Sequence, residues 1–352
     1  MVEPSSSELS VRERQVLEAV VRTYVETAEP AGSRSVTRRF DLGVSPATVR
    51  NTMSDLEDKG YLCHPHASAG RVPTDLAYRV FVEHFMQPIR LTELEKSRLA
   101  LELDLGGTSP VERLVRRATR ALGLLSQELG VAAAPRLATA ILERLELVKV
   151  SSQRVLMVAR VRSGMVRTVF VHLPCEIPED TLVTLTLLLN ERLAGLTLEE
   201  VRDTVAIRIK DAAPEDDPAA EEILNIFMHS GGELFDWPET QGSTIHLGQA
   251  SVLASQPEFT SGQRLKELME LTEQTDLLAT ALGSRSHQRG IQITIGGEND
   301  DEALSDFTLI TSEYRVGRLK GVIGVIGPTR MPYEKVCAIV EHTSALVTKI
   351  LD

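Results

Sequence analysis

The chain lacks most features that mark secreted or membrane-spanning proteins. It has three cysteines among 352 residues, and Cys63, Cys175 and Cys337 lie far apart. Such cysteines indicate a reducing compartment without structural disulfides. No apolar run reaches the roughly 18 residues that span a bilayer, and no N-terminal stretch is typical of a signal peptide. We therefore expect a cytoplasmic protein.

An excess of positive charge is also missing. The 38 Lys and Arg residues are outnumbered by 50 Asp and Glu residues, which gives a formal net charge of −12. This balance argues against a general nucleic-acid coat or a polybasic membrane binder. It fits a small basic module attached to larger acidic domains, and the length predicts two or three domains of about 100–200 residues.

No catalytic constellation can be named. The four glycines between positions 317 and 327 match neither G-x-G-x-x-G nor a P-loop, and glycines in strands more often mark bulges or close backbone approach. His172 and Cys175, three residues apart, do not suffice for a nucleophile–base pair. We expect no enzyme activity, no metal and no cofactor.

The most informative pattern lies in residues 45–71. Ser45 is suited to cap a helix and Pro46 to occupy its first position. Apolar residues at Val49, Met53 and Leu56 then form one buried stripe. The opposite face carries small side chains or side chains with donors and acceptors, namely Ala47, Thr48, Arg50, Asn51 and Ser54.

A glycine and a short hairpin follow this helix. Gly60 ends the helix, residues 61–63 form a short apolar strand, and residues 66–70 form a polar tip before Arg71. Helix, stop and basic hairpin is the layout of a winged helix-turn-helix, which reads DNA. The alternative is a surface helix of an all-α domain.

Two helices are expected before this segment. Ser10 and Glu13 match the capping box, and apolar residues with helical spacing then continue to Ala28. Ser33 is expected to cap a second helix that runs to about Phe40, and Gly43 suits a tight turn. The third helix is therefore placed to enter a major groove by its N-terminal end.

The charges in this region predict which end faces DNA. Between residues 33 and 50, four arginines stand against Asp41, a local balance of +3. Asp55, Glu57 and Asp58 lie at the far end of the third helix, where they oppose its dipole and would repel phosphate. The N-terminal half and the hairpin are thus the expected contact surfaces.

Individual roles follow from side-chain chemistry. Arg50 is expected to contact a guanine edge or a phosphate, and Asn51 either pairs with adenine or is simply solvated. Ser45 and Thr48 suit phosphate or short base contacts, and the hairpin suits a phosphate or minor-groove role. The candidate DNA-binding residues are Arg34, Arg38, Arg39, Ser45, Thr48, Arg50, Asn51, Ser68, Gly70 and Arg71.

Cys63, His64 and His66 also invite a metal-site interpretation. A zinc site needs four ligands, and the chain offers no second Cys/His pair at zinc spacing. Strand residues at the base of a wing are the better account.

Two further segments resemble a known family together with the region above. SPATVRNTMSDLEDKGYL (45–62) with HPHASAGRVPTDLAYR (64–79), QPEF (256–259) and YRVGRLKGVIGVIGPTRMPYEKV (314–336) resemble, in the same order, the bacterial heat-inducible transcription repressor HrcA family. The resemblance implies a winged helix, a GAF-like domain and a dimerisation insert within the latter. It also implies a homodimer that binds an inverted-repeat operator in double-stranded DNA upstream of chaperone operons, with activity maintained by the chaperonin GroEL.

The expected fold is therefore α+β and multidomain, because strand patterns at 145–173 and 291–326 flank a mainly helical stretch. We predict a flexible tail at 1–8, a winged-helix domain at 9–86, a helical connector and start of the GAF-like domain at 87–144, its first part at 145–190, an inserted, mainly helical dimerisation domain at 191–290, and its second part at 291–352.

One alternative function stays open at this point. A winged-helix repressor of metabolic genes would bind a metabolite in the GAF-like domain instead of depending on a chaperonin. An enzyme with a DNA-binding appendage is a third class, which the missing catalytic constellation disfavours.

Overall fold

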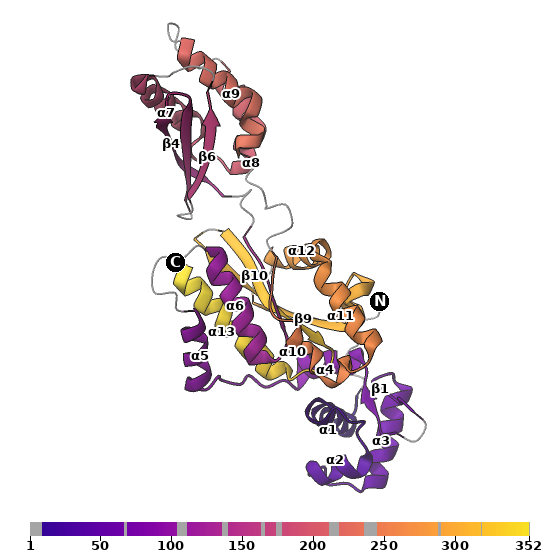
Figure 1. Ribbon diagram of the computed structural model, residues 1–352. Helices are drawn as coiled ribbons and strands as arrows, with labels where there is room; N and C mark the ends of the chain where they lie inside the picture. Colours follow the sequence, from indigo (N-terminus) through magenta and orange to yellow (C-terminus); the bar gives the residue numbers. More distant parts are fainter. Residues whose placement is uncertain are drawn as a thin grey trace. The chain divides into compact units, whose positions relative to one another are not determined.

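The computed structural model describes residues 9–66, 69–103, 111–135, 140–162, 166–173, 178–210, 218–235, 245–287, 290–317 and 319–351. The chain divides into two compact units. The first comprises residues 1–132, 246–313 and 322–347, and the second comprises 133–245, 314–321 and 348–352. The whole is an α+β protein, as expected (Figure 1).

The first unit begins with a helical module that carries a short antiparallel strand pair. Its elements are α1 (Val11–Thr27), α2 (Ser33–Arg39), α3 (Pro46–Asp58), β1 (Leu62–Cys63), β2 (Val72–Pro73) and α4 (Asp75–His84). The predicted capping box is present in α1, where the Ser10 amide donates to Glu13 over 2.7 Å and the Glu13 amide donates to Ser10 Oγ.

The predicted starts of α3 and α4 are also confirmed. Ser45 Oγ accepts from the Thr48 amide at 3.2 Å, with Pro46 directly after it, and Thr74 accepts from the Ala77 amide. The start of α2 differs from the expectation. Gly32 is its N-cap, while Ser35 bonds back to the Gly32 backbone at 3.1 Å and 2.7 Å.

A five-stranded sheet forms the centre of the second part of this unit. Its strand order is β7 (Ile245–Leu247), β3 (Leu129–Ala133), β10 (Leu319–Pro328), β9 (Phe307–Val316) and β8 (Ile291–Ile295), and β8 pairs antiparallel with β9. The helices around it are α5 (Glu93–Leu103), α6 (Val111–Ser126), α10 (Ser251–Ala254), α11 (Gly262–Glu273), α12 (Thr275–Gly283) and α13 (Tyr333–Leu351).

Successive residues of β9 reach opposite faces of this sheet, since side chains alternate along a strand. Ser312 donates to Ser344 of α13 at 3.1 Å. Its neighbour Thr311 accepts from Arg285, in the short helix after α12, at 3.4 Å. Helical segments therefore pack on both faces, and α6 and α13 lie on one side of the sheet in Figure 1.

Arginine–carboxylate contacts seat the N-terminal module against this sheet domain. Arg22 of α1 bonds both carboxylate oxygens of Glu334 at 3.0 Å and 3.2 Å. Arg79 of α4 donates to both carboxylate oxygens of Glu298 and to the Ile293 carbonyl, the latter at 2.8 Å. The carboxylates belong to the sheet domain in both cases, so the module is held by directed contacts.

A third arginine belongs to the sheet domain and reaches into the N-terminal module. Arg330, just after β10, pairs with Glu258 and donates to the carbonyl of Val25 in α1 at 2.8 Å. Glu258 belongs to the QPEF segment, whose Gln256 donates to the Glu128 carboxyl at 3.3 Å. The QPEF segment thus contacts both Arg330 and Glu128.

Glu128 is a buried carboxyl, with 1 % of its surface exposed. Burial raises its pKa well above the usual value, against the opposing effects of the Gln256 hydrogen bond and of Arg330. A side chain on Gly327 would lie 2.0 Å from its Oε2, so glycine at that position makes room for it.

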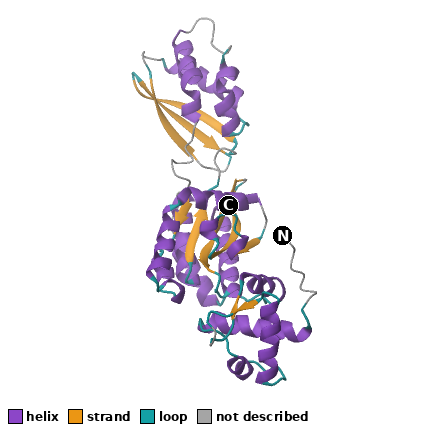
Figure 2. Ribbon diagram, turned by 90° about the vertical axis from the view of Figure 1, so that its right-hand side faces the viewer, coloured by secondary structure: helices purple, strands orange, loops and turns teal. Residues whose placement is uncertain are grey.

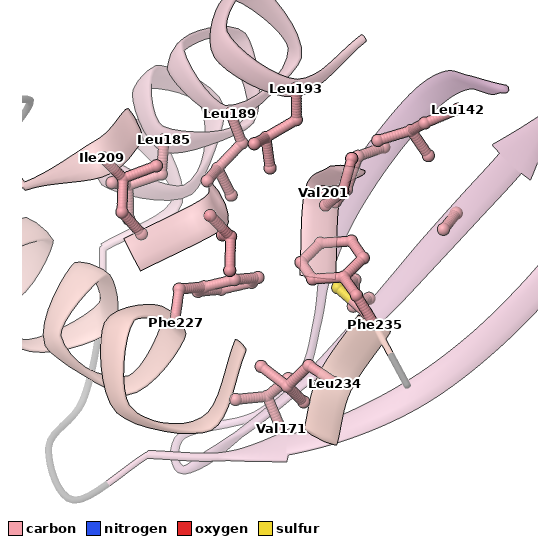
Figure 3. Packing of buried hydrophobic residues seen from close by; sticks show 14 of the residues in the cluster. Leu142, Val171, Leu185, Leu189, Leu193, Val201, Ile209, Phe227, Leu234 and Phe235 are labelled. Carbon is pink, nitrogen blue, oxygen red and sulfur yellow. The ribbon is translucent and has the colours of Figure 1, made fainter. Parts of the chain in front are cut away.

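The second unit is a three-stranded antiparallel sheet with helices on one face (Figure 2). Its strands are β4 (Leu142–Ser151), β5 (Arg154–Val161) and β6 (Val166–His172), and its helices are α7 (Glu179–Leu193), α8 (Leu198–Ile209) and α9 (Pro218–Phe235). The core lies between them, and Figure 3 shows Phe227 and Phe235 of α9 among strand and helix residues. Their ring centroids are 6.3 Å apart.

This division differs from the predicted boundaries. The strands of 142–172 pack with α7, α8 and α9 in one unit, whereas residues 246–290 belong to the other. Local patterns place β4, β5, β6 and the helices after them correctly, but they do not show which helix covers the alternating apolar face of these strands. The β3 and β7 strands also lie in segments expected to be helical.

The buried Glu128 predicts a specific pH dependence of stability. A carboxyl whose pKa is raised in the folded state contributes fully below its unfolded pKa of about 4.3, and that contribution is lost as pH rises through the folded value. Glu128→Gln should therefore gain stability relative to the parent chain as pH rises from 5 to 9, measured by thermal unfolding. Parallel pH profiles of the two proteins would contradict the prediction.

Candidate nucleic-acid interface

Helix α3 presents one polar, exposed face. Arg50 and Asn51 are exposed, while Val49 and Leu56 are fully buried and Met53 is 3 % exposed. The predicted stripe is therefore the inward face, and the residues expected to reach a base edge lie on the outward face. Ser45 and Thr48 cap the start of this face, with their hydroxyl oxygens 3.0 Å apart.

The arginines of α2 lie beside this face in sequence and are also exposed. Val36 is the buried anchor of α2, and Arg34, Arg38 and Arg39 are exposed. Arg39 forms an ion pair with Glu26 of α1, whose side chain is 57 % exposed. A pair this exposed is screened and weak, so Arg39 stays available to other anions.

The hairpin residues are placed differently from these arginines. Arg71 is only 14 % exposed, because its Nη2 lies 2.6 Å from Oε2 of Glu57 and its Nη1 lies 2.7 Å from Nδ1 of His64. Gly70 lies against the α1–α2 turn, where a side chain at that position would meet backbone atoms of Pro30 and Ala31 at 2.6 Å. Ser68 lies outside the described residues.

A backbone bridge explains the position of Gly70. Ala31 donates to the Arg71 carbonyl at 2.8 Å and accepts from the Arg71 amide at 3.0 Å. The predicted site residues thus fall into two groups: an exposed set on α2 and α3, and a packed pair at the end of the hairpin. Sequence reasoning missed Glu57, His64 and Ala31 as partners of Arg71, and no local spacing signals such contacts.

The far end of α3 is acidic, as the charge pattern predicts. Asp55 and Asp58 are exposed, and Glu57 is half-buried against the hairpin. Exposed arginines lie on α2, in the first half of α3 and, as Arg12 and Arg14, in the first turn of α1. Helix α3 therefore carries its arginine in its first half and its carboxylates in its second half.

Cys63 is the last residue of strand β1, and His64 and His66 follow it outside the strand. Cys63 pairs with Val72 in the β1–β2 register, and burial, with a smaller effect of Glu57, raises the pKa of its thiol. Within the described ranges, His, Cys, Asp and Glu side chains form no cluster with metal-site geometry. Within the same ranges, no helix combines the length and apolarity of a membrane span.

An exposed polar helix face beside arginines is typical of modules that bind nucleic acid. A family model described as "HrcA protein C terminal domain" matches residues 112–337. The heat-inducible transcription repressor HrcA of Chlorobium phaeovibrioides is 36 % identical, with 98 % of each chain covered. That of Geobacter sulfurreducens is 34 % identical over 98 % of this chain and 99 % of its own.

The chain belongs to the HrcA family of heat-inducible transcription repressors. Among solved structures, one titled a hypothetical protein at 2.2 Å resolution superposes with a TM-score of 0.64 over 98 % of this chain and 99 % of its own. At 20 % identity it supports the fold alone.

The close approach at Gly70 predicts the effect of one methyl group. Gly70→Ala should weaken the bridge by about 1–3 kcal/mol, the usual cost of overpacking, and should raise amide hydrogen exchange at Ala31 and Arg71 in the full-length protein. Gly262→Ala is the matched control, because no atom lies within 4 Å of its added carbon. Unchanged exchange in Gly70→Ala would show that the turn adjusts without cost.

Proposed function

We propose that this chain represses transcription by binding an inverted-repeat operator upstream of chaperone genes as a homodimer in the cytoplasm. The N-terminal module acts as a winged helix-turn-helix, with α3 in the major groove and the β1–β2 hairpin as its wing. The observation that carries this proposal is the outward face of α3, where Arg50 and Asn51 are exposed beside the arginines of α2.

The division of labour follows from side-chain chemistry. Arg34, Arg38 and Arg39 contact phosphates and supply affinity without sequence preference. Arg50 bonds a guanine edge and Asn51 an adenine edge, each good base contact contributing about 1–3 kcal/mol of discrimination. Ser45 and Thr48 contact the DNA backbone at the helix start, and Ser68 and the backbone of Gly70 contribute the contacts of the hairpin.

The acidic remainder of the chain supports this orientation. With a net charge of −12, the protein as a whole is repelled by DNA, so binding depends on the basic end of the module. Asp55 and Asp58 lie at the other end of α3, and repulsion between their carboxylates and the DNA phosphates keeps that end away from the duplex.

Control by the chaperonin GroEL is the regulatory part of the proposal. It is supported by membership of the heat-inducible repressor family. An active repressor would depend on available chaperonin, and heat-damaged proteins would compete for that chaperonin.

The homodimer is proposed to form through the outer face of the β4–β5–β6 sheet, which precedes the segment 191–290 expected to carry dimerisation but packs with its first helices in one unit. The register aligns Val148, Leu156 and Phe170 directly across the three strands, and Val148 and Phe170 are 45 % and 52 % exposed. An apolar row of this kind marks an interaction surface. A twofold axis would place the row of one protomer against the same row of its partner.

A gel shift tests the reading role of Arg50. Arg50→Ala should reduce the preference for the palindrome over scrambled DNA by about 1–3 kcal/mol, because one guanine contact is lost, while affinity for scrambled DNA changes little. Arg38→Ala is the comparison, since a phosphate contact weakens both complexes alike. An unchanged preference in Arg50→Ala would reject the assignment of that residue.

The dimer surface is tested by sedimentation. Phe170→Ser should weaken dimerisation by a factor on the order of 10²–10⁴, because each protomer loses about 1.5–3 kcal/mol of burial. Val183→Ser on the exposed side of α7, at 60 % exposure, is the control and should leave the dimer intact. If Phe170→Ser dimerises at the same protein concentration as the parent chain, the dimer interface lies elsewhere.

A further inference from the structure

The guanidinium of Arg71 is bound inside the N-terminal module on two sides. Its Nη2 lies 2.6 Å from Oε2 of Glu57, in the last turn of α3. Its Nη1 lies 2.7 Å from Nδ1 of His64, at the end of β1. Its Nε is buried and bonds no group in the described part of the chain. The guanidinium charge and both of its terminal nitrogens are therefore engaged by groups of the protein itself.

The backbone of the same residue is fixed to a different element. The two hydrogen bonds between Arg71 and Ala31 join the hairpin to the α1–α2 turn. One residue therefore links three parts of the module: the turn before α2, the end of α3 and the hairpin.

A phosphate contact by Arg71 would carry a penalty that contacts by exposed arginines do not carry. The guanidinium would have to leave Glu57, whose side chain is 29 % exposed. The carboxylate would then lose its guanidinium partner at the C-terminal end of a helix, where the helix dipole already disfavours negative charge. Removing one partner of a desolvated ion pair is costly for this reason. Arg34 and Arg38, in contrast, are exposed.

We propose that Arg71 is a positioning residue, and that the Arg71–Glu57 pair fixes the β1–β2 hairpin against the C-terminal end of α3. His64 orients the guanidinium as a second acceptor. The DNA-binding test of this inference rests on the proposed function, whereas the hydrogen-exchange test does not.

The two roles of Arg71 differ in the sign of the Glu57 effect. If Arg71 binds phosphate, Glu57→Gln removes a competing carboxylate and binding becomes tighter or stays equal. If the pair positions the hairpin, Glu57→Gln and Arg71→Gln each weaken operator binding by roughly 5- to 50-fold, and the double variant is no weaker than either one. Arg71→Lys should not restore binding, because an ammonium cannot bridge both partners.

The experiment uses the full-length chain and a labelled palindromic duplex, with titrations well below the unfolding temperature. The matched control is the exposed Arg39–Glu26 pair, in which Glu26→Gln should not weaken binding and Arg39→Gln should. Hydroxyl-radical footprints add a positional readout. Glu57→Gln should lose backbone protection at the flank under the hairpin while protection under α3 remains.

Amide hydrogen exchange makes the test independent of DNA. Glu57→Gln and Arg71→Gln should both accelerate exchange at Ala31 and Arg71, and the double variant should not exceed them. Normal binding and exchange in Glu57→Gln, with weak binding in Arg71→Gln, would overturn the inference in favour of a phosphate contact. If the parent chain shows no preference for the palindrome, the proposed function fails. The exchange data then decide alone whether the Arg71–Glu57 pair fixes the hairpin.

Discussion

The pairing of arginines with carboxylates across the seam between the N-terminal module and the five-stranded sheet domain constrains the first unit. Arg22 and Arg79 leave the module to meet Glu334 and Glu298, and Arg330 leaves the sheet domain to reach the carbonyl of Val25. A guanidinium fork fixes direction as well as distance, because its donors lie in one plane. The module is therefore held at a defined angle, whereas an apolar contact alone would permit sliding.

This seam also explains why a buried carboxyl is tolerated next to it. Glu128 lies near Arg330 and accepts from Gln256, and the glycine at 327 leaves space for its oxygen. A charged carboxylate would need a full set of partners at this depth, since desolvation penalises the charged form. The raised pKa of Glu128 reflects this desolvation. The QPEF segment serves both groups, because Gln256 bonds Glu128 and Glu258 pairs with Arg330.

Much of the module could be predicted from the sequence because its determinants are local. The Ser10–Glu13 box and Ser45 with Pro46 each act within four residues, the stripe through Val49, Met53 and Leu56 repeats every three to four residues, and each is present. The domain boundaries could not be predicted in the same way. Strands β4, β5 and β6 bury one face against helices up to about 90 residues later, and alternation shows that a face is buried but not what covers it. Strand β3 pairs within a sheet whose neighbours lie more than 100 residues away, so its short apolar run was indistinguishable from helix.

The candidate site shows the same limit at the level of single residues. Composition places five arginines in one basic group, since Arg34, Arg38, Arg39, Arg50 and Arg71 carry the same charge. The structure separates them by their partners: four are exposed, and the fifth is enclosed by Glu57 and His64. A cation that already neutralises a neighbouring carboxylate adds little to the field a phosphate experiences at that point. The acidic end of α3 therefore has a structural contact, because Glu57 pairs with Arg71 of the hairpin, and under the proposed function Asp55 and Asp58 would repel phosphate at that end. Under the proposed function, affinity and geometry thus depend on different arginines of one small module, and charge alone does not distinguish them.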